Sequence, residues 1–128
     1  MSRPDGGKSS LAKSFAYAFT GIANAAGERN FKIECAIGIV AIVLGLAFRI
    51  SLAEWLAVII CIGLVLALEI VNTSLEAIVD LASPQLDERA RRAKDCAAGA
   101  VLVASLAALA VGVMLFAPRI LSMLGLLG

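Results

Sequence analysis

Apolar residues are concentrated in three segments of the chain, and charged residues lie mainly outside these segments. The runs Cys35–Phe48 and Trp55–Leu68 each contain 14 residues without a charge, and Cys96–Ala117 contains 22. A helix needs about 20 apolar residues to cross the hydrocarbon core of a bilayer, so the third run is long enough by itself. The first two reach that length by adding residues 31–34 and 69–71, whose charged ends can extend to the interface. The pattern therefore predicts three membrane-spanning helices.

A different pattern precedes these spans. Between Ser9 and Ala26 the apolar residues fall on one helical stripe and the polar residues lie largely off it. The stripe consists of Leu11, Phe15, Phe19, Ile22 and Ala26. This spacing fits an amphipathic helix on the membrane surface, and it fits an ordinary packed helix equally well. We take the surface helix as the prediction, with a disordered segment over residues 1–8 and a C-terminal tail over residues 121–128.

The composition supports a membrane environment for this pattern. Of 128 residues, 61% are hydrophobic and 16% are charged, which is more apolar surface than a small domain can hide from water. The net charge of +1 gives no field that would attract nucleic acid. The chain has no histidine, so histidine-based acid–base chemistry and histidine metal sites are excluded. The sequence predicts an all-α membrane protein with one domain.

Basic residues predict how the helices are oriented. Nine basic residues lie before the first span or after the second, namely Arg3, Lys8, Lys13, Arg29, Lys32, Arg89, Arg91, Arg92 and Lys94. The other side has only Arg49 and Arg119. Because basic residues accumulate on the cytoplasmic side, the N-terminus is predicted to be cytoplasmic and the C-terminus external.

The second span carries the residues of chemical interest. Glu69, Asn72, Glu76 and Asp80 are spaced 3, 4 and 4 apart, which places them within about 80° on one helix face. Glu69 lies about 10 Å deeper along the helix than Glu76. A carboxylate below the interface costs a few kcal/mol, roughly, unless it is partnered or protonated. These residues therefore indicate either a buried site or polar contacts that join subunits.

More charges are predicted to meet this line at the cytoplasmic interface. They are Glu28, Glu76, Asp80, Lys94 and Asp95, with Arg91 and Arg92 nearby. Clustered carboxylates repel one another and favour a divalent cation, and Mg²⁺ on one or two carboxylates usually arrives with phosphates. For Lys94 and Asp95 alone, a solvated helix start explains the charges as well as a site does.

Three motifs in this region resemble the prokaryotic diacylglycerol kinase and undecaprenol kinase family. They are Glu28-Arg29-Asn30-Phe31, the string LALEIVNTSLEAIVDL at 66–81, and Ala93-Lys94-Asp95 leading into AAGAVLVA at 97–104. The resemblance covers residues 10–118. It implies a membrane lipid-kinase domain over residues 9–120, a homotrimer of three-helix subunits in the bacterial inner membrane, and composite active sites at the cytoplasmic interface.

The resemblance also implies a role for each matched residue. Glu69 would be the catalytic base, and Asn72 would orient groups near it. Glu28 and Glu76 would hold Mg²⁺ on the ATP phosphates. Lys94 and Asp95 would contact the nucleotide, and Lys13 and Tyr17 would cover it. The role of Asp80 stays open.

Two questions remain at this level. The acceptor would be undecaprenol or diacylglycerol, and the motif wording favours undecaprenol, although Glu34 stands where that branch often has histidine. The alternative function is a small ion- or proton-translocating subunit that uses an intramembrane glutamate. Such a protein needs polar groups through both leaflets, but the second span has none between Glu54 and Glu69. This favours a half-buried active site.

Overall fold

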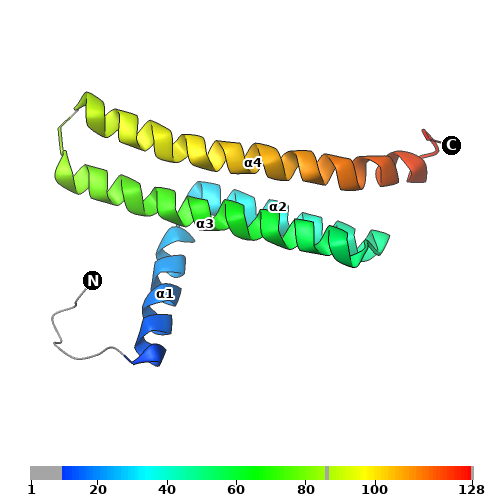
Figure 1. The fold of residues 1–128 in the computed structure, drawn as a ribbon, viewed down its shortest axis with the longest axis horizontal. Coiled ribbons are helices and arrows are strands. Elements are labelled where there is room, and N and C mark those ends of the chain that lie inside the picture. The colour runs from blue at the N-terminus through cyan, green and yellow to red at the C-terminus, as the bar shows by residue number, and fades with distance from the viewer. Residues whose placement is uncertain (1–9, 86, 128) are drawn as a thin grey trace.

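The computed structural model describes residues 10–85 and 87–127, and the described residues form four helices (Figure 1). The helices are α1 (Leu11–Ala25), α2 (Arg29–Phe48), α3 (Leu52–Ala82) and α4 (Glu88–Met123). The described part of the chain contains no strand, which confirms the predicted all-α class. The predicted disordered segment over residues 1–8 lies outside the described residues.

Helices α2, α3 and α4 are long and apolar enough to cross a membrane, with mean hydropathies of 2.2, 2.4 and 2.6 over their best windows. The three predicted spans are thus confirmed. Each helix is longer than the apolar run that predicted it. The 31 residues of α3 extend for about 46 Å, well beyond a hydrocarbon core of about 30 Å. One end of α3 can therefore protrude into the interface.

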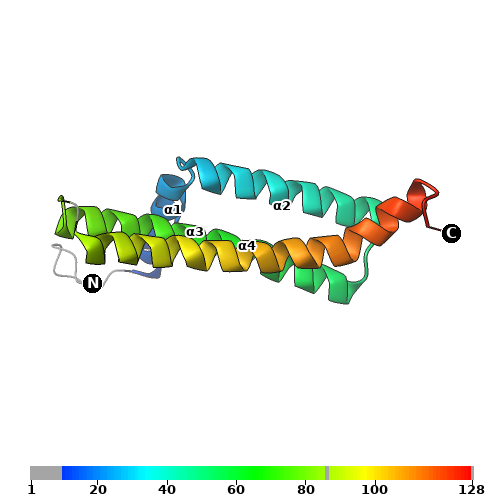
Figure 2. The same ribbon diagram turned by 90° about the horizontal axis from the view of Figure 1, so that it is seen from above.

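Helix α1 crosses the direction in which the other three run (Figures 1 and 2). It joins the bundle at its C-terminal end, where Ala25 is buried. The apolar stripe residues Leu11, Phe15 and Phe19 are exposed. The exposed stripe and the crossing direction favour a helix that lies along a membrane surface over an ordinary packed helix.

The bundle is held mainly by α3. Helix α4 packs along α3 most extensively, α2 packs on α3 less, and α2 and α4 barely touch. The largest buried cluster, formed by Ile50, Val58 and Phe116, lies at the end where α2 turns into α3. There Gly45 allows close approach, since a Cβ atom on it would lie 2.7 Å from Cη2 of Trp55. Most other large apolar side chains of the spans are exposed, as expected for surfaces that contact lipid or other subunits.

The chain turns are fixed by local caps. Arg49 ends α2 in the left-handed conformation (φ 52°), and Ser51 and Glu54 form a reciprocal capping box at the start of α3. Asp87 caps α4 by accepting a 2.7 Å hydrogen bond from the Arg89 amide. These short turns make α3 antiparallel to both α2 and α4.

Helix α4 continues through Pro118 to Met123, three residues into the segment we assigned to the C-terminal tail. Proline removes one backbone donor from a helix. In the interrupted turn, Nη1 of Arg119 donates a 2.6 Å hydrogen bond to the Leu115 carbonyl. The same guanidinium pairs with Glu54 at 2.8 Å, which ties the end of α4 to the start of α3.

Candidate active site

A polar line occupies one face of α3 in its second half. Glu69 and Asn72 are the only buried polar residues in the described part of the chain, at 3% and 7% exposure. Nδ2 of Asn72 donates a 3.3 Å hydrogen bond to Oε1 of Glu76, one turn further along. We define Glu69, Asn72 and Glu76 as the polar line. The structure brings these three predicted residues together as the helical spacing requires.

Two buried oxygens of the polar line lack a partner. They are Oε2 of Glu69 and Oδ1 of Asn72. A buried acceptor left unsatisfied costs about 1–3 kcal/mol, more when it is charged. Both atoms can accept a hydrogen bond or coordinate a cation, and neither can donate while Glu69 is ionised. The line is therefore suited to a ligand that brings a hydroxyl group or a hard metal ion.

Glu28 approaches the polar line from a second element. It is the N-cap residue of α2, and its backbone amide is held by the Ala25 carbonyl at 2.9 Å. The charges of Glu76 and Glu28 both act on Glu69. Glu28 and Glu76 are both exposed, so a ligand in the aqueous phase can reach them.

The carboxylates fit a magnesium ion only in a particular way. No group of three or more described His, Cys, Asp or Glu residues is arranged to hold a metal ion. A Mg²⁺ ion usually takes one or two carboxylates and completes its six ligands with water and phosphate oxygens. Glu28 and Glu76 would supply that number of carboxylates, and Asn72, which bonds Glu76, has a further oxygen without a partner.

Lys94 reaches the same end of the bundle from α4. Its ammonium forms an ion pair with Asp80 across the α3–α4 interface, and the charge of Glu76 also acts on it. Asp95, the next residue, is exposed, and its side chain forms no hydrogen bond or ion pair with another described residue. The structure thus brings Lys94 to the end of the bundle where the polar line lies. Asp95 follows Lys94 in the chain and stays exposed.

The two residues predicted on the first helix lie apart from this cluster. Lys13 and Tyr17 belong to the N-terminal half of α1, which extends away from α3 (Figure 1). Lys13 is exposed and Tyr17 is half-buried. Within the described residues, no hydrogen bond or ion pair joins Lys13 to the polar line.

Sequence reasoning missed a groove that begins beside the polar line. The groove has a volume of about 580 Å³, lies between α2, α3 and α4, and is almost wholly apolar. Glu34 lines it, feels the charge of Glu69, and has a buried Oε2 without a partner. The signal in the sequence was the helical spacing of Glu34, Gly38 and Ala41, which places an acid on the face that carries small residues.

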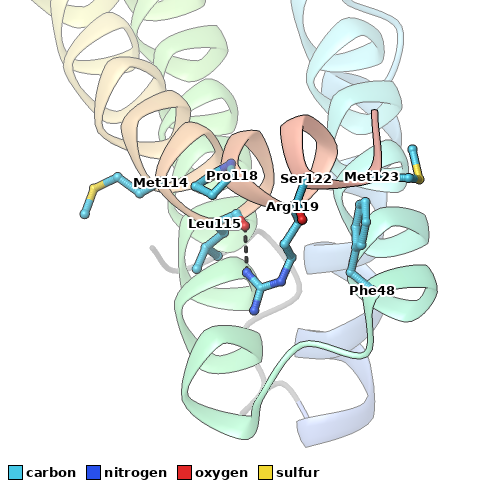
Figure 3. Close-up of a pocket in the computed structure, with 7 residues that line it drawn as sticks. All are labelled: Phe48, Met114, Leu115, Pro118, Arg119, Ser122 and Met123. Atoms are coloured by element: carbon cyan, nitrogen blue, oxygen red, sulfur yellow. Dashed lines mark hydrogen bonds between the residues drawn. The ribbon is translucent and has the colours of Figure 1, made fainter. Parts of the chain in front are cut away.

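A second cavity, of about 590 Å³, lies at the opposite end of the bundle (Figure 3). It is lined by Phe48, Met114, Leu115, Pro118, Arg119, Ser122 and Met123. Its charged residue is fully engaged, because Arg119 bonds the Leu115 carbonyl and both carboxylate oxygens of Glu54. None of the predicted site residues lines it. This cavity lies where the end of α4 is bonded to the start of α3, and it does not extend the polar line.

The polar line also ends where the sequence indicated. Below Glu69, the described polar residues nearest the other end of α3 are Ser51 and Glu54, which are bonded to each other, and Glu54 is also bonded to Arg119. The part of α3 between Glu54 and Glu69 is apolar. A continuous polar path through the described bundle is therefore missing, and ion translocation is not favoured.

Comparison with known proteins gives consistent matches. A family model described as "Prokaryotic diacylglycerol kinase" matches residues 16–116. An undecaprenol kinase of Bacillus subtilis is 36% identical over 109 residues, which cover 84% of this chain and 89% of that protein. A diacylglycerol kinase of Synechocystis sp. is 40% identical over 116 residues, which cover 89% of this chain but 66% of that protein. The family match contains the polar line, Glu28 and the α3–α4 hairpin, and it begins after Lys13.

Proposed function

Because this chain belongs to the prokaryotic diacylglycerol kinase family, we propose that it transfers the γ-phosphate of ATP to a hydroxyl group of a membrane lipid. The observation that carries the proposal is the buried Glu69 carboxylate. It lies two turns below the exposed Glu76, on a helix that is otherwise apolar at that depth. A nucleotide arrives from water, and a lipid hydroxyl stays at the membrane interface. A site that binds both substrates must therefore have side chains at both depths along the helix.

Glu69 acts as the general base in this proposal. The lipid hydroxyl oxygen bonds to the γ-phosphorus of ATP, the bond from that phosphorus to the bridging oxygen breaks, and ADP leaves. The hydroxyl proton passes to Oε2 of Glu69, the atom that has no partner within the chain. Asn72 uses its Nδ2 to fix Glu76 and keeps Oδ1 for a ligand, so it orients groups on both sides.

Glu28 and Glu76 would hold Mg²⁺, which would neutralise charge on the ATP phosphates. Lys94 binds the same phosphates through its ammonium. We assign Asp95, Lys13 and Tyr17 to nucleotide binding on the family motif. For Lys13 and Tyr17, this requires α1 to move toward the polar line or to serve a neighbouring subunit.

The lipid tail occupies the apolar groove that starts beside Glu69. A tail bound there leaves its hydroxyl near the base and stays in contact with the bilayer. We propose undecaprenol as the acceptor, with diacylglycerol as the second choice. The relative named undecaprenol kinase supports this order, since it matches this chain over most of both lengths.

We propose that the protein lies in the bacterial inner membrane with its N-terminus in the cytoplasm, and the nine-to-two distribution of basic residues supports this orientation. It works as a homotrimer. The support is the large apolar surface that α2–α4 leave exposed, together with an active-site end that is open in a single chain. A neighbouring subunit would cover that end.

A phosphorylation assay tests the proposed function. Purified protein in mixed micelles is given Mg²⁺, ATP labelled at the γ-phosphate, and either undecaprenol or diacylglycerol. We expect label in the undecaprenol fraction, with slower or no labelling of diacylglycerol. Preferential labelling of diacylglycerol would reverse the substrate order. Label in neither lipid would contradict the kinase function.

A further inference from the structure

We infer that Asp80 is a positioning residue for phosphoryl transfer, because it holds the Lys94 ammonium beside the polar line. The inference rests on the proposed function, in which Lys94 meets the ATP phosphates. The motif gave Asp80 no role, and the structure gives it one partner on another helix.

The geometry places Asp80 between the site and the hairpin. It lies one turn beyond Glu76 on the same face of α3, and its carboxylate pairs with Lys94 in the second turn of α4. A lysine has a flexible four-carbon stem, so an unanchored ammonium samples a wide arc of solvent. The ion pair limits Lys94 to the side of α4 that faces the polar line.

The neighbouring charges make this pairing selective. Asp87 is bonded to Arg89, and Glu88 is paired with Arg91, so the two acids at the start of α4 are engaged within their own turn. Glu76 is the other carboxylate whose charge acts on Lys94. Without Asp80, Lys94 would turn to Glu76 and occupy a carboxylate needed for Mg²⁺. Asp80 thus keeps Lys94 close to the site and Glu76 open.

A purely structural role is a weaker explanation of this ion pair. The two side chains are 41% and 66% exposed, and ion pairs so exposed contribute little to stability. Helices α3 and α4 are already joined by the most extensive packing in the molecule. Loss of Asp80 should therefore affect function far more than folding.

A double-mutant cycle tests the inference. KM for ATP, kcat and thermal stability are measured for the wild type, Asp80→Asn, Lys94→Met and the double variant. We expect Asp80→Asn to raise KM for ATP by about tenfold, the size of one charge-assisted hydrogen bond, with a smaller change in kcat. In the Lys94→Met background, the same substitution should change nothing further, because its effect passes through Lys94. Asp80→Glu should restore most of the affinity.

Glu88→Gln is the matched control, since it removes the same charge from the same hairpin without touching Lys94; its KM for ATP should equal that of the wild type. If Asp80→Asn and Lys94→Met have independent, multiplying effects, Asp80 does not act through Lys94 and the inference fails. The inference also fails if Asp80→Asn lowers thermal stability and leaves KM unchanged. A wild-type protein that phosphorylates no lipid overturns the proposed function, and this inference with it.

Discussion

The amide nitrogen of Asn72 lies 3.3 Å from a carboxylate oxygen of Glu76 and donates a hydrogen bond to it, while its own oxygen remains buried and free. This contact connects the buried part of the polar line with its exposed end at Glu76. It fixes the Glu76 carboxylate from below and leaves acceptors at both levels for a ligand.

The first prediction concerns the metal. Glu76→Gln keeps the shape of the side chain but removes the charge that would hold Mg²⁺. We expect a higher Mg²⁺ requirement and at least about 10²-fold slower turnover. The fold should survive, because the substitution removes a charge from an exposed position. Initial rates over a Mg²⁺ titration measure both effects, and full activity at ordinary Mg²⁺ would show that Glu76 is not a metal ligand.

The second prediction concerns orientation. In a background with Cys35, Cys61 and Cys96 replaced by alanine, Gln85→Cys should react only with thiol reagents that reach the cytoplasm. Leu126→Cys, at the other end of α4, is the control and should react only with reagents added outside. The reverse result would put the carboxylates on the side without ATP.

The third prediction concerns packing between α2 and α3. Gly45→Ala adds a Cβ atom that would lie 2.7 Å from Trp55 and 3.1 Å from Ile50. We expect a loss of about 1–3 kcal/mol in stability, the usual range for overpacking. Gly63→Ala is the control, because nothing lies within 4 Å of its added carbon. Thermal unfolding in detergent compares the two, and equal stability would contradict this packing.

The fourth prediction separates the far end of the bundle from the site. Arg119→Met removes two hydrogen bonds, one to the Leu115 carbonyl and one to Oε1 of Glu54, together with the ion pair to Oε2 of Glu54. We expect a lower midpoint of thermal unfolding, because the end of α4 loses its contacts with the start of α3. KM for ATP should stay at the wild-type value. A large rise in KM without a loss of stability would mean that Arg119 acts on the site.

Periodicity predicted the parts of this structure that depend on one helix. The face shared by Glu69, Asn72 and Glu76 follows from a helical repeat, so no tertiary information was needed. The contacts between helices could not be predicted in the same way. The pairs Glu54–Arg119 and Asp80–Lys94 join residues far apart in the chain, and many other charges had suitable partners.

Helix ends were also difficult to predict from the sequence. The charge-free run of the second span stops at Leu68, and only the helical spacing of the acids that follow predicted a longer helix, which ends at Ala82. Pro118 does not end α4, which continues to Met123, so the usual rule that proline stops a helix would have placed this end too early. The groove lined by Glu34 depends on how α2 leans on α3, which no local pattern encodes.

The central claim is that Glu69 is the base and Glu76 belongs to the metal and nucleotide site. The most direct test measures turnover and Mg·ATP affinity together for Glu69→Gln and Glu76→Gln. Glutamine keeps the shape of Glu69 but cannot take the hydroxyl proton, so turnover should fall about 10²–10⁴-fold while nucleotide affinity stays close to that of the wild type. Glu76→Gln should weaken nucleotide binding as well. If Glu69→Gln loses nucleotide affinity as severely as Glu76→Gln, Glu69 belongs to the metal cluster, and the assignment of the base is wrong.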